Sequence, residues 1–152
     1  MNKIDLKKPT SIEDDFALWA AEQGALLRGR NFERIDLENI AEEIESLGRS
    51  GKYEIVSRLE VLLCHLLKWQ FQGEKRTNSW RATLREQRRR ILDVIEESPS
   101  LKRYPGEKLD RAYIIGRGAA IDQTRLPEST FPETCPYTIE QVLDPDFLPD
   151  GE

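Results

Sequence analysis

The stretch RLEVLLCHLLKWQF, residues 58–71, is the part of this sequence that decides its fold class. Its apolar residues recur at intervals of three and four, which places them on one side of an α-helix. Together with Ile55, these positions cover a broad arc of the helix, because successive residues are turned by about 100°. So wide an apolar arc predicts a central helix that other elements contact on more than one side.

Four further segments have the spacing of amphipathic helices, and they lie at about residues 14–29, 36–47, 78–97 and 107–125. Ser11, with Asp14 three residues later, is typical of the start of the first segment. Residues 48–51 contain two glycines, which either bend the chain or end a helix before the central one begins. In the last segment, Gly116 and Ala120 are small enough to let a neighbouring helix approach closely. No segment shows the period-two alternation of a strand.

The chain changes character beyond residue 126, where prolines at 127, 132, 136, 145 and 149 forbid a long helix. Thr138 and Gln141 form a capping signature for one short turn. Phe131, Tyr137 and Phe147 are too apolar for a free linker, so we expect them to hold this segment against the helices. The sequence therefore predicts an all-α protein, with a compact bundle of about five helices in residues 1–126. An irregular proline-rich tail, residues 127–152, packs on that bundle within a single domain.

Composition narrows the class of protein. The net charge of −5 argues against a whole-protein field that attracts nucleic acid. No apolar run is long enough to span a membrane, and the first residues lack the apolar core of an export signal, so we expect a cytoplasmic protein. The two cysteines are too few for a disulfide framework, and Cys64 lies in the central helix as a small core residue.

Five pieces of the sequence together resemble one known family, and they are residues 14–32, 36–50, 57–72, 79–91 and 131–149. The first of them reads DDFALWAAEQGALLRGRNF and the fourth SWRATLREQRRRI. The chain resembles the bacterial family catalogued as domain of unknown function 29, over almost its whole length. The resemblance implies an all-α bacterial domain. It brings no assigned activity, cofactor or site, so it gives no role to any residue.

A row of arginines is the first candidate binding site. Arg81, Arg85 and Arg88 are spaced four and three residues apart, so they share one side of a predicted helix. The guanidinium group suits planar recognition of phosphate or carboxylate. The row therefore either binds a nucleic-acid backbone or pairs with carboxylates, within the chain or on a partner protein. The net charge and the absence of a recognition motif favour carboxylates, with Glu42 or Glu43 as mates within the chain.

A catalytic site is the second possibility. His65, the only histidine, lies at the edge of the apolar arc and would titrate near neutral pH. Its candidate catalytic partners are Glu42 and Glu43, although a packed histidine with one hydrogen bond is the simpler interpretation. Cys64 and His65 point about 100° apart on a helix and cannot easily share an ion. We therefore expect no metal site and no cofactor.

Three classes of function follow from these observations. The leading one is a protein-interaction or regulatory module that acts through charged helix faces, with another protein or a second copy as its partner. The second is an enzyme that combines His65 with the carboxylates and arginines named above, and the sequence leaves open whether the protein is an enzyme. The third is a nucleic-acid binder that uses residues 81–90. The sequence names no partner and no substrate.

Overall fold

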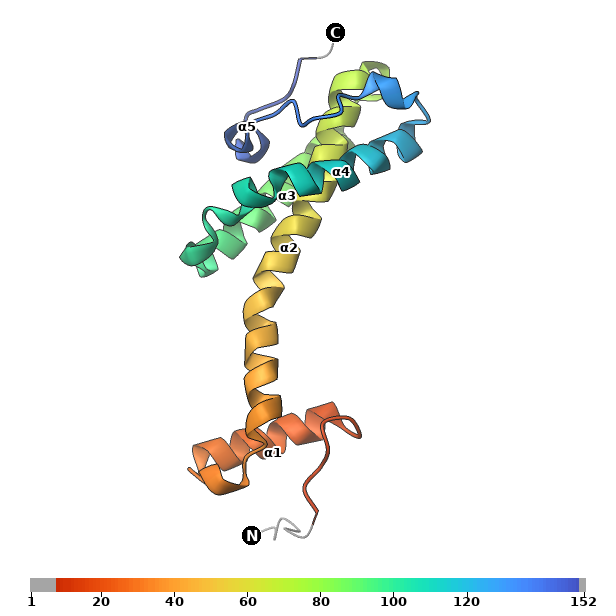
Figure 1. The fold of residues 1–152 in the computed structure, drawn as a ribbon. Coiled ribbons are helices and arrows are strands. Elements are labelled where there is room, and N and C mark those ends of the chain that lie inside the picture. Colours follow the sequence, from red (N-terminus) through yellow and green to blue (C-terminus); the bar gives the residue numbers. More distant parts are fainter. Residues whose placement is uncertain (1–7, 151–152) are drawn as a thin grey trace. The chain divides into compact units, whose positions relative to one another are not determined.

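The structure is a computed structural model that describes residues 8–150 of the chain. Residues 1–7, on which the expectation about an export signal partly depends, lie outside the described part. The described residues form helices, turns and irregular segments but no strand, so the predicted all-α class is confirmed. Their α-helices are α1 (Phe16–Arg28), α2 (Leu37–Phe71), α3 (Asn78–Glu97), α4 (Tyr104–Thr124) and α5 (Ile139–Leu143) (Figure 1).

The second predicted helix and the central helix are one continuous element, α2, of 35 residues. Gly48 and Gly51 lie within it and do not end it, although each lowers helix stability by about 1 kcal/mol relative to alanine. Gly51 has a packing role, because a Cβ atom there would lie 3.2 Å from Val94 Cγ1 and 3.3 Å from Leu101 Cδ1. The missing side chain thus leaves room for apolar neighbours, and their packing helps the helix to continue.

The chain divides into two compact units. The N-terminal unit is described from residue 8 to residue 48 and holds α1, the 3-10 turn Phe32–Arg34 and the first part of α2. The C-terminal unit is described from residue 49 to residue 150 and holds the rest of α2, α3, α4 and the tail with α5. The two units differ in how much apolar surface they bury.

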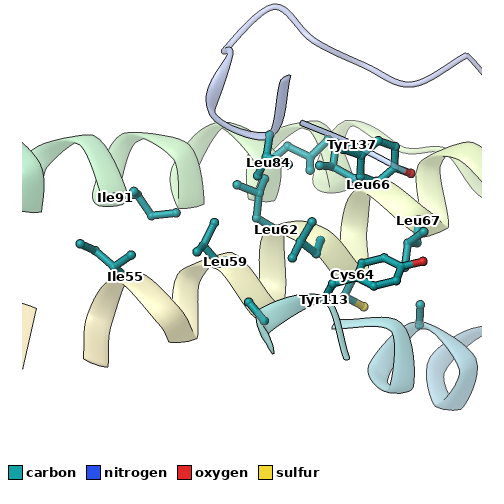
Figure 2. Packing of buried hydrophobic residues seen from close by; sticks show 14 of the residues in the cluster. Ile55, Leu59, Leu62, Cys64, Leu66, Leu67, Leu84, Ile91, Tyr113 and Tyr137 are labelled. Atoms are coloured by element: carbon teal, nitrogen blue, oxygen red, sulfur yellow. The ribbon is translucent and has the colours of Figure 1, made fainter. Parts of the chain in front are cut away.

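The C-terminal unit has a continuous apolar core, shown in Figure 2. Its centre is the arc of α2 that the sequence predicts, which is fully buried at Ile55, Leu59, Leu62, Leu63, Leu66 and Leu67. From α3, Leu84 and Ile91 complete it. α4 approaches α2 closely at Gly116, as predicted, because a Cβ atom there would lie 2.9 Å from the Glu60 carbonyl oxygen.

The tail packs on the C-terminal unit through a few buried side chains. The ring of Phe131 meets the ring of Phe71 edge to face, with centroids 5.6 Å apart. Tyr137 is buried, and its hydroxyl group donates a hydrogen bond of 2.7 Å to Gln70 Oε1. The capping box at Thr138, which the sequence predicts, starts α5. These contacts fix a segment that its prolines keep from forming a long helix.

The N-terminal unit has very little core, and among its described residues only Trp19 and Gln23 are buried. A polar cluster around Asp36 joins its two helices. The carboxylate of Asp36 accepts hydrogen bonds from Asn39 Nδ2 at 2.8 Å and from Trp19 Nε1 at 3.0 Å, and both lower the Asp36 pKa. The start of α1 differs from the sequence prediction: its N-cap is Asp15, whose side chain accepts from the Leu18 amide.

Candidate functional site

α3 places three arginines beside the core of the C-terminal unit. Thr77 caps the helix, accepting a hydrogen bond of 3.2 Å from the Trp80 amide at its Oγ1. Leu84 and Ile91 then point into the core. The helical repeat places the predicted binding residues Arg81, Arg85 and Arg88 on successive turns of α3, along the edge beside its core-facing side.

The structure brings these three arginines together in one pocket of about 240 Å³. One wall is α3, which also contributes Leu84. The opposite wall is the tail, which contributes Pro145, Asp146 and Leu148. These three tail residues are not predicted from the sequence, because no local pattern tells which helix an irregular segment will lie against.

Arg88 is the buried member of these three arginines, with only 2% of its surface exposed. Its Nε donates to the Val142 carbonyl oxygen at 2.9 Å, and its Nη2 donates to the Phe147 carbonyl oxygen at 2.8 Å. Its Nη1 forms no hydrogen bond with a described residue, yet no fully buried side-chain nitrogen or oxygen there lacks a partner. Nη1 therefore keeps some access to solvent, and Arg88 is one of the residues that line the pocket.

Burial lowers the pKa of Arg88, while the nearby carboxylates of Asp144 and Asp146 raise it. A guanidinium group stays protonated in proteins even when its pKa falls, because its ordinary value is so high. The pocket thus contains a fixed positive charge. Its one lining carboxylate, Asp146, is outnumbered by the three arginines.

Arg81 and Arg85 are exposed, in contrast to Arg88. The guanidinium group of Arg81 lies over the ring of Trp69, 5.1 Å from its centroid, which restricts its position. Neither side chain forms a hydrogen bond or an ion pair with any residue in the described range 8–150. Both guanidinium groups therefore keep their donor edges available for an anion.

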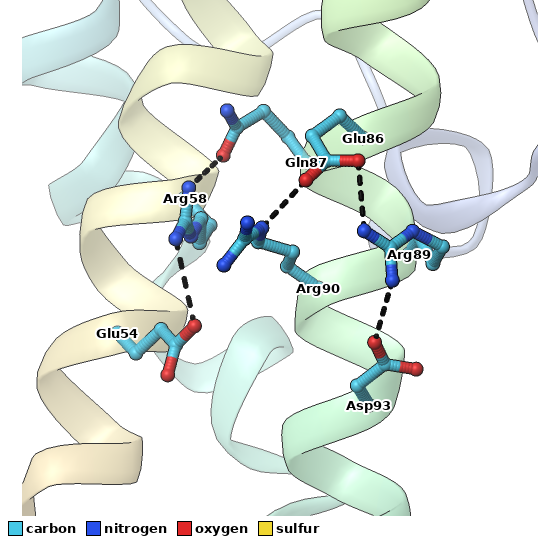
Figure 3. A network of polar contacts seen from close by, with 7 residues as sticks. All are labelled: Glu54, Arg58, Glu86, Gln87, Arg89, Arg90 and Asp93. Atoms are coloured by element: carbon cyan, nitrogen blue, oxygen red, sulfur yellow. Dashed lines mark hydrogen bonds and ion pairs between the residues drawn. The ribbon is translucent and has the colours of Figure 1, made fainter.

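The adjoining arginines of the basic run are neutralised within the unit, as Figure 3 shows. Arg90 Nε lies 2.6 Å from Glu86 Oε1, one helical turn earlier. Arg89 bridges Glu86 at 2.9 Å and Asp93 at 3.2 Å. The hydrogen bonds from Arg90 and then Arg89 lower the pKa of Glu86 to about 2. The basic run of α3 thus contains two kinds of exposed arginine. Arg89 and Arg90 are paired with carboxylates, whereas Arg81 and Arg85 have no ion-pair partner among the described residues.

A second polar contact in Figure 3 links α2 to α3. Arg58 Nη1 donates to Gln87 Oε1 at 3.3 Å, and Arg58 Nη2 lies 3.6 Å from Glu54 Oε1. Arg58 is thereby held by its own unit and is separate from the pocket residues.

The candidate catalytic residues are placed elsewhere. His65 is half-buried, and its Nδ1 lies 2.9 Å from the Val61 carbonyl oxygen, one turn earlier in α2. Burial lowers the His65 pKa, because it disfavours the charged form of the ring. His65 does not line the arginine pocket. Glu42 and Glu43 belong to the N-terminal unit. Their pairing with the arginines of α3 stays a prediction.

The described residues offer few groups for metal binding or thiol chemistry. Within residues 8–150, no three histidine, cysteine or acidic side chains are grouped so that they could hold a metal ion. Cys64 is buried, and burial raises its pKa to about 11, which keeps the thiol protonated. None of the described helices has the length and apolarity that a membrane crossing requires.

Comparison with known proteins places both units in one family. The family model of DUF29, a domain of unknown function, matches residues 12–148, which include every residue of the arginine pocket. No curated protein and no solved structure matches the chain.

Proposed function

The chain belongs to the DUF29 family, and we propose that it is a protein-interaction module whose arginine pocket binds carboxylate groups of a partner protein. One observation carries the proposal. Arg81 and Arg85 have no anionic partner among the described residues, and they line the same pocket as the buried Arg88.

The geometry suits a carboxylate because the guanidinium groups of Arg81 and Arg85 can each offer two parallel N–H donors. Arg88 is locked by two backbone carbonyls and Arg81 rests on Trp69, so less side-chain freedom is lost on binding. Leu84, Pro145 and Leu148 add apolar contact beside the charges. The volume of about 240 Å³ is below the ~300 Å³ at which most cofactor and small-molecule sites begin, which favours one or two side chains of a partner.

The other two classes receive less support from the same residues. A nucleic-acid backbone is bound by a row of uncompensated basic groups, whereas Arg89 and Arg90 already pair with Glu86 and Asp93. For an enzyme, His65 is the natural proton carrier, and it does not line the pocket.

A peptide-binding experiment tests the proposal. A fluorescently labelled hexaglutamate peptide should bind the parent protein at 0.15 M salt, and a hexalysine peptide should not. Arg85→Glu should weaken hexaglutamate binding about tenfold or more, because it removes one ionic hydrogen-bond pair and adds repulsion. Arg89→Glu is the matched control, since Arg89 is an exposed arginine one turn away that lies outside the pocket.

Equal weakening by the two substitutions would show that the peptide senses only general charge, and it would overturn the proposal. Absence of hexaglutamate binding to the parent protein would do the same. A parallel titration with random single-stranded RNA or double-stranded DNA separates the nucleic-acid alternative. Micromolar binding that falls steeply with salt and disappears in Arg85→Glu would favour that alternative.

A further inference from the structure

A further arginine lies beside the arginine pocket, over the ring of Trp69 near the C-terminal end of α2. Two guanidinium groups lie over this ring: that of Arg81, which also lines the pocket, and that of Arg76, which does not. Their Cζ atoms are 5.1 Å and 5.0 Å from the ring centroid, which keeps the two atoms within about 10 Å of each other. Arg76 therefore places another positive charge next to the pocket.

Local interactions hold the Arg76 side chain in this place. Arg76 follows the 3-10 turn Gly73–Lys75, and its Nε donates a hydrogen bond of 2.7 Å to the Trp69 carbonyl oxygen. That carbonyl belongs to the last turn of α2, where a helix leaves its own carbonyl oxygens without donors. The guanidinium group also packs against the loop, because a Cβ atom at Gly73 would lie 3.5 Å from Arg76 Cζ. Little side-chain freedom is therefore lost when Arg76 binds a ligand.

The positive charge of Arg76 is not offset within the described part of the chain. Its Nη atoms form no ion pair and no hydrogen bond with a described residue. Glu74, the only acidic residue of the loop 72–77, forms no ion pair there either. The first turn of α3 has no acidic residue, although carboxylates are favourable at the positive end of a helix. Arg76, Arg81 and Arg85 are thus three cations that lack carboxylate partners among the described residues.

We propose that the partner segment bound by the arginine pocket carries a second carboxylate, and that Arg76 binds it. This inference rests on the proposed function and names the kind of segment: an extended peptide with two acidic side chains close together. In an extended chain, every second side chain points the same way, and such residues are about 7 Å apart. That spacing lies within the limit set by Arg76 and Arg81. A Glu-x-Glu pattern therefore suits one carboxylate in the pocket and the next on Arg76.

The same residues favour a peptide over a single-stranded nucleic acid. Single strands are bound by cations together with aromatic rings on which the bases stack. Trp69 has only 6% of its surface exposed, so its ring is not open to a base. What remains for recognition is the set of guanidinium N–H donors, and a pair of carboxylates matches them without any stacking.

The first test compares two neighbouring cations of the same loop. Arg76→Gln should weaken binding of the labelled hexaglutamate peptide by about threefold or more, because it removes one charge-assisted contact. Lys75→Gln is the matched control, since Lys75 is an exposed cation that is not one of those over Trp69, and it should leave binding unchanged. Circular dichroism at the titration temperature checks that both variants are folded. Equal weakening by the two substitutions would overturn the proposal.

The second test varies the number of carboxylates on the peptide. Acetylated and amidated Glu-Ser-Glu and Gln-Ser-Glu carry two carboxylates and one, and NMR titration measures their affinities even in the millimolar range. In the parent protein, the second carboxylate should strengthen binding about fivefold or more, above the roughly twofold gain from two equivalent groups. In Arg76→Gln the gain should fall to about twofold. A purely structural role of Arg76 would weaken both peptides equally, and that result would contradict the proposal.

The two tests separate failure of this inference from failure of the proposed function. Hexaglutamate binding that depends on Arg85 but not on Arg76 would overturn this inference alone. Hexaglutamate binding that is absent, or that does not respond to Arg85→Glu, would overturn both. Micromolar binding of single-stranded RNA that is lost in Arg76→Gln would assign the site to a nucleic acid and would also overturn the proposal.

Discussion

At the scale of single residues, three arginines of α3 occupy three different environments. Arg88 is buried against carbonyl oxygens of the tail, Arg90 is paired with Glu86, and Arg85 is exposed in the pocket. Helical spacing predicts that Arg81, Arg85 and Arg88 share one side. It cannot tell which of them is buried, because the partners of Arg88 lie more than fifty residues later in the chain.

Arg88→Leu should lower the free energy of unfolding by about 2–4 kcal/mol, because it removes two hydrogen bonds of a charged group and leaves two carbonyl oxygens without their donor. Arg85→Leu removes no such bond and should change stability by less than about 0.5 kcal/mol. Urea unfolding followed by circular dichroism measures both. Similar midpoints for the two variants would mean that Arg88 does not hold the tail.

At the scale of secondary-structure elements, periodicity predicts where helices form better than where they begin and end. The apolar arc around Leu62 predicts the central position of α2 correctly. The glycines at 48 and 51 leave open whether the helix bends or ends there, and the structure shows one continuous helix. The sequence cannot decide this, because the packing around Gly51 involves residues far along the chain. The same kind of packing governs the approach of α4 to α2 at Gly116.

A matched pair of glycine substitutions in α4 tests that approach. Gly116→Ala should destabilise the protein by about 1–2 kcal/mol, because the new Cβ would lie 2.9 Å from the Glu60 carbonyl oxygen and 3.0 Å from Leu63 Cβ. Gly118→Ala has nothing within 4 Å of its Cβ and should stabilise the helix by up to about 1 kcal/mol. Thermal melting distinguishes the two, and equal shifts of the melting temperature would contradict the close contact.

At the scale of the whole molecule, the sequence predicts the all-α class and the arginine row but not the pocket. The pocket exists because the tail lies beside α3, and proline-rich segments carry no periodicity from which such a position can be read. The segment at residues 36–47 has the spacing of an amphipathic helix, yet Leu37, Ile44 and Leu47 within it are exposed. A pattern shows that a face is suited to burial, but not which surface covers it.

In the function that we propose, Arg81 and Arg85 form an open carboxylate site, whereas the neighbouring Arg89 and Arg90 already pair with carboxylates of α3. The most direct measurement is a titration of the ¹⁵N-labelled protein with hexaglutamate, observed at the arginine Nε–H signals. We expect saturable shifts for Arg81 and Arg85, with the signals of Arg89 and Arg90 nearly unchanged. Equal shifts for all four arginines, or no shift at Arg85, would contradict it.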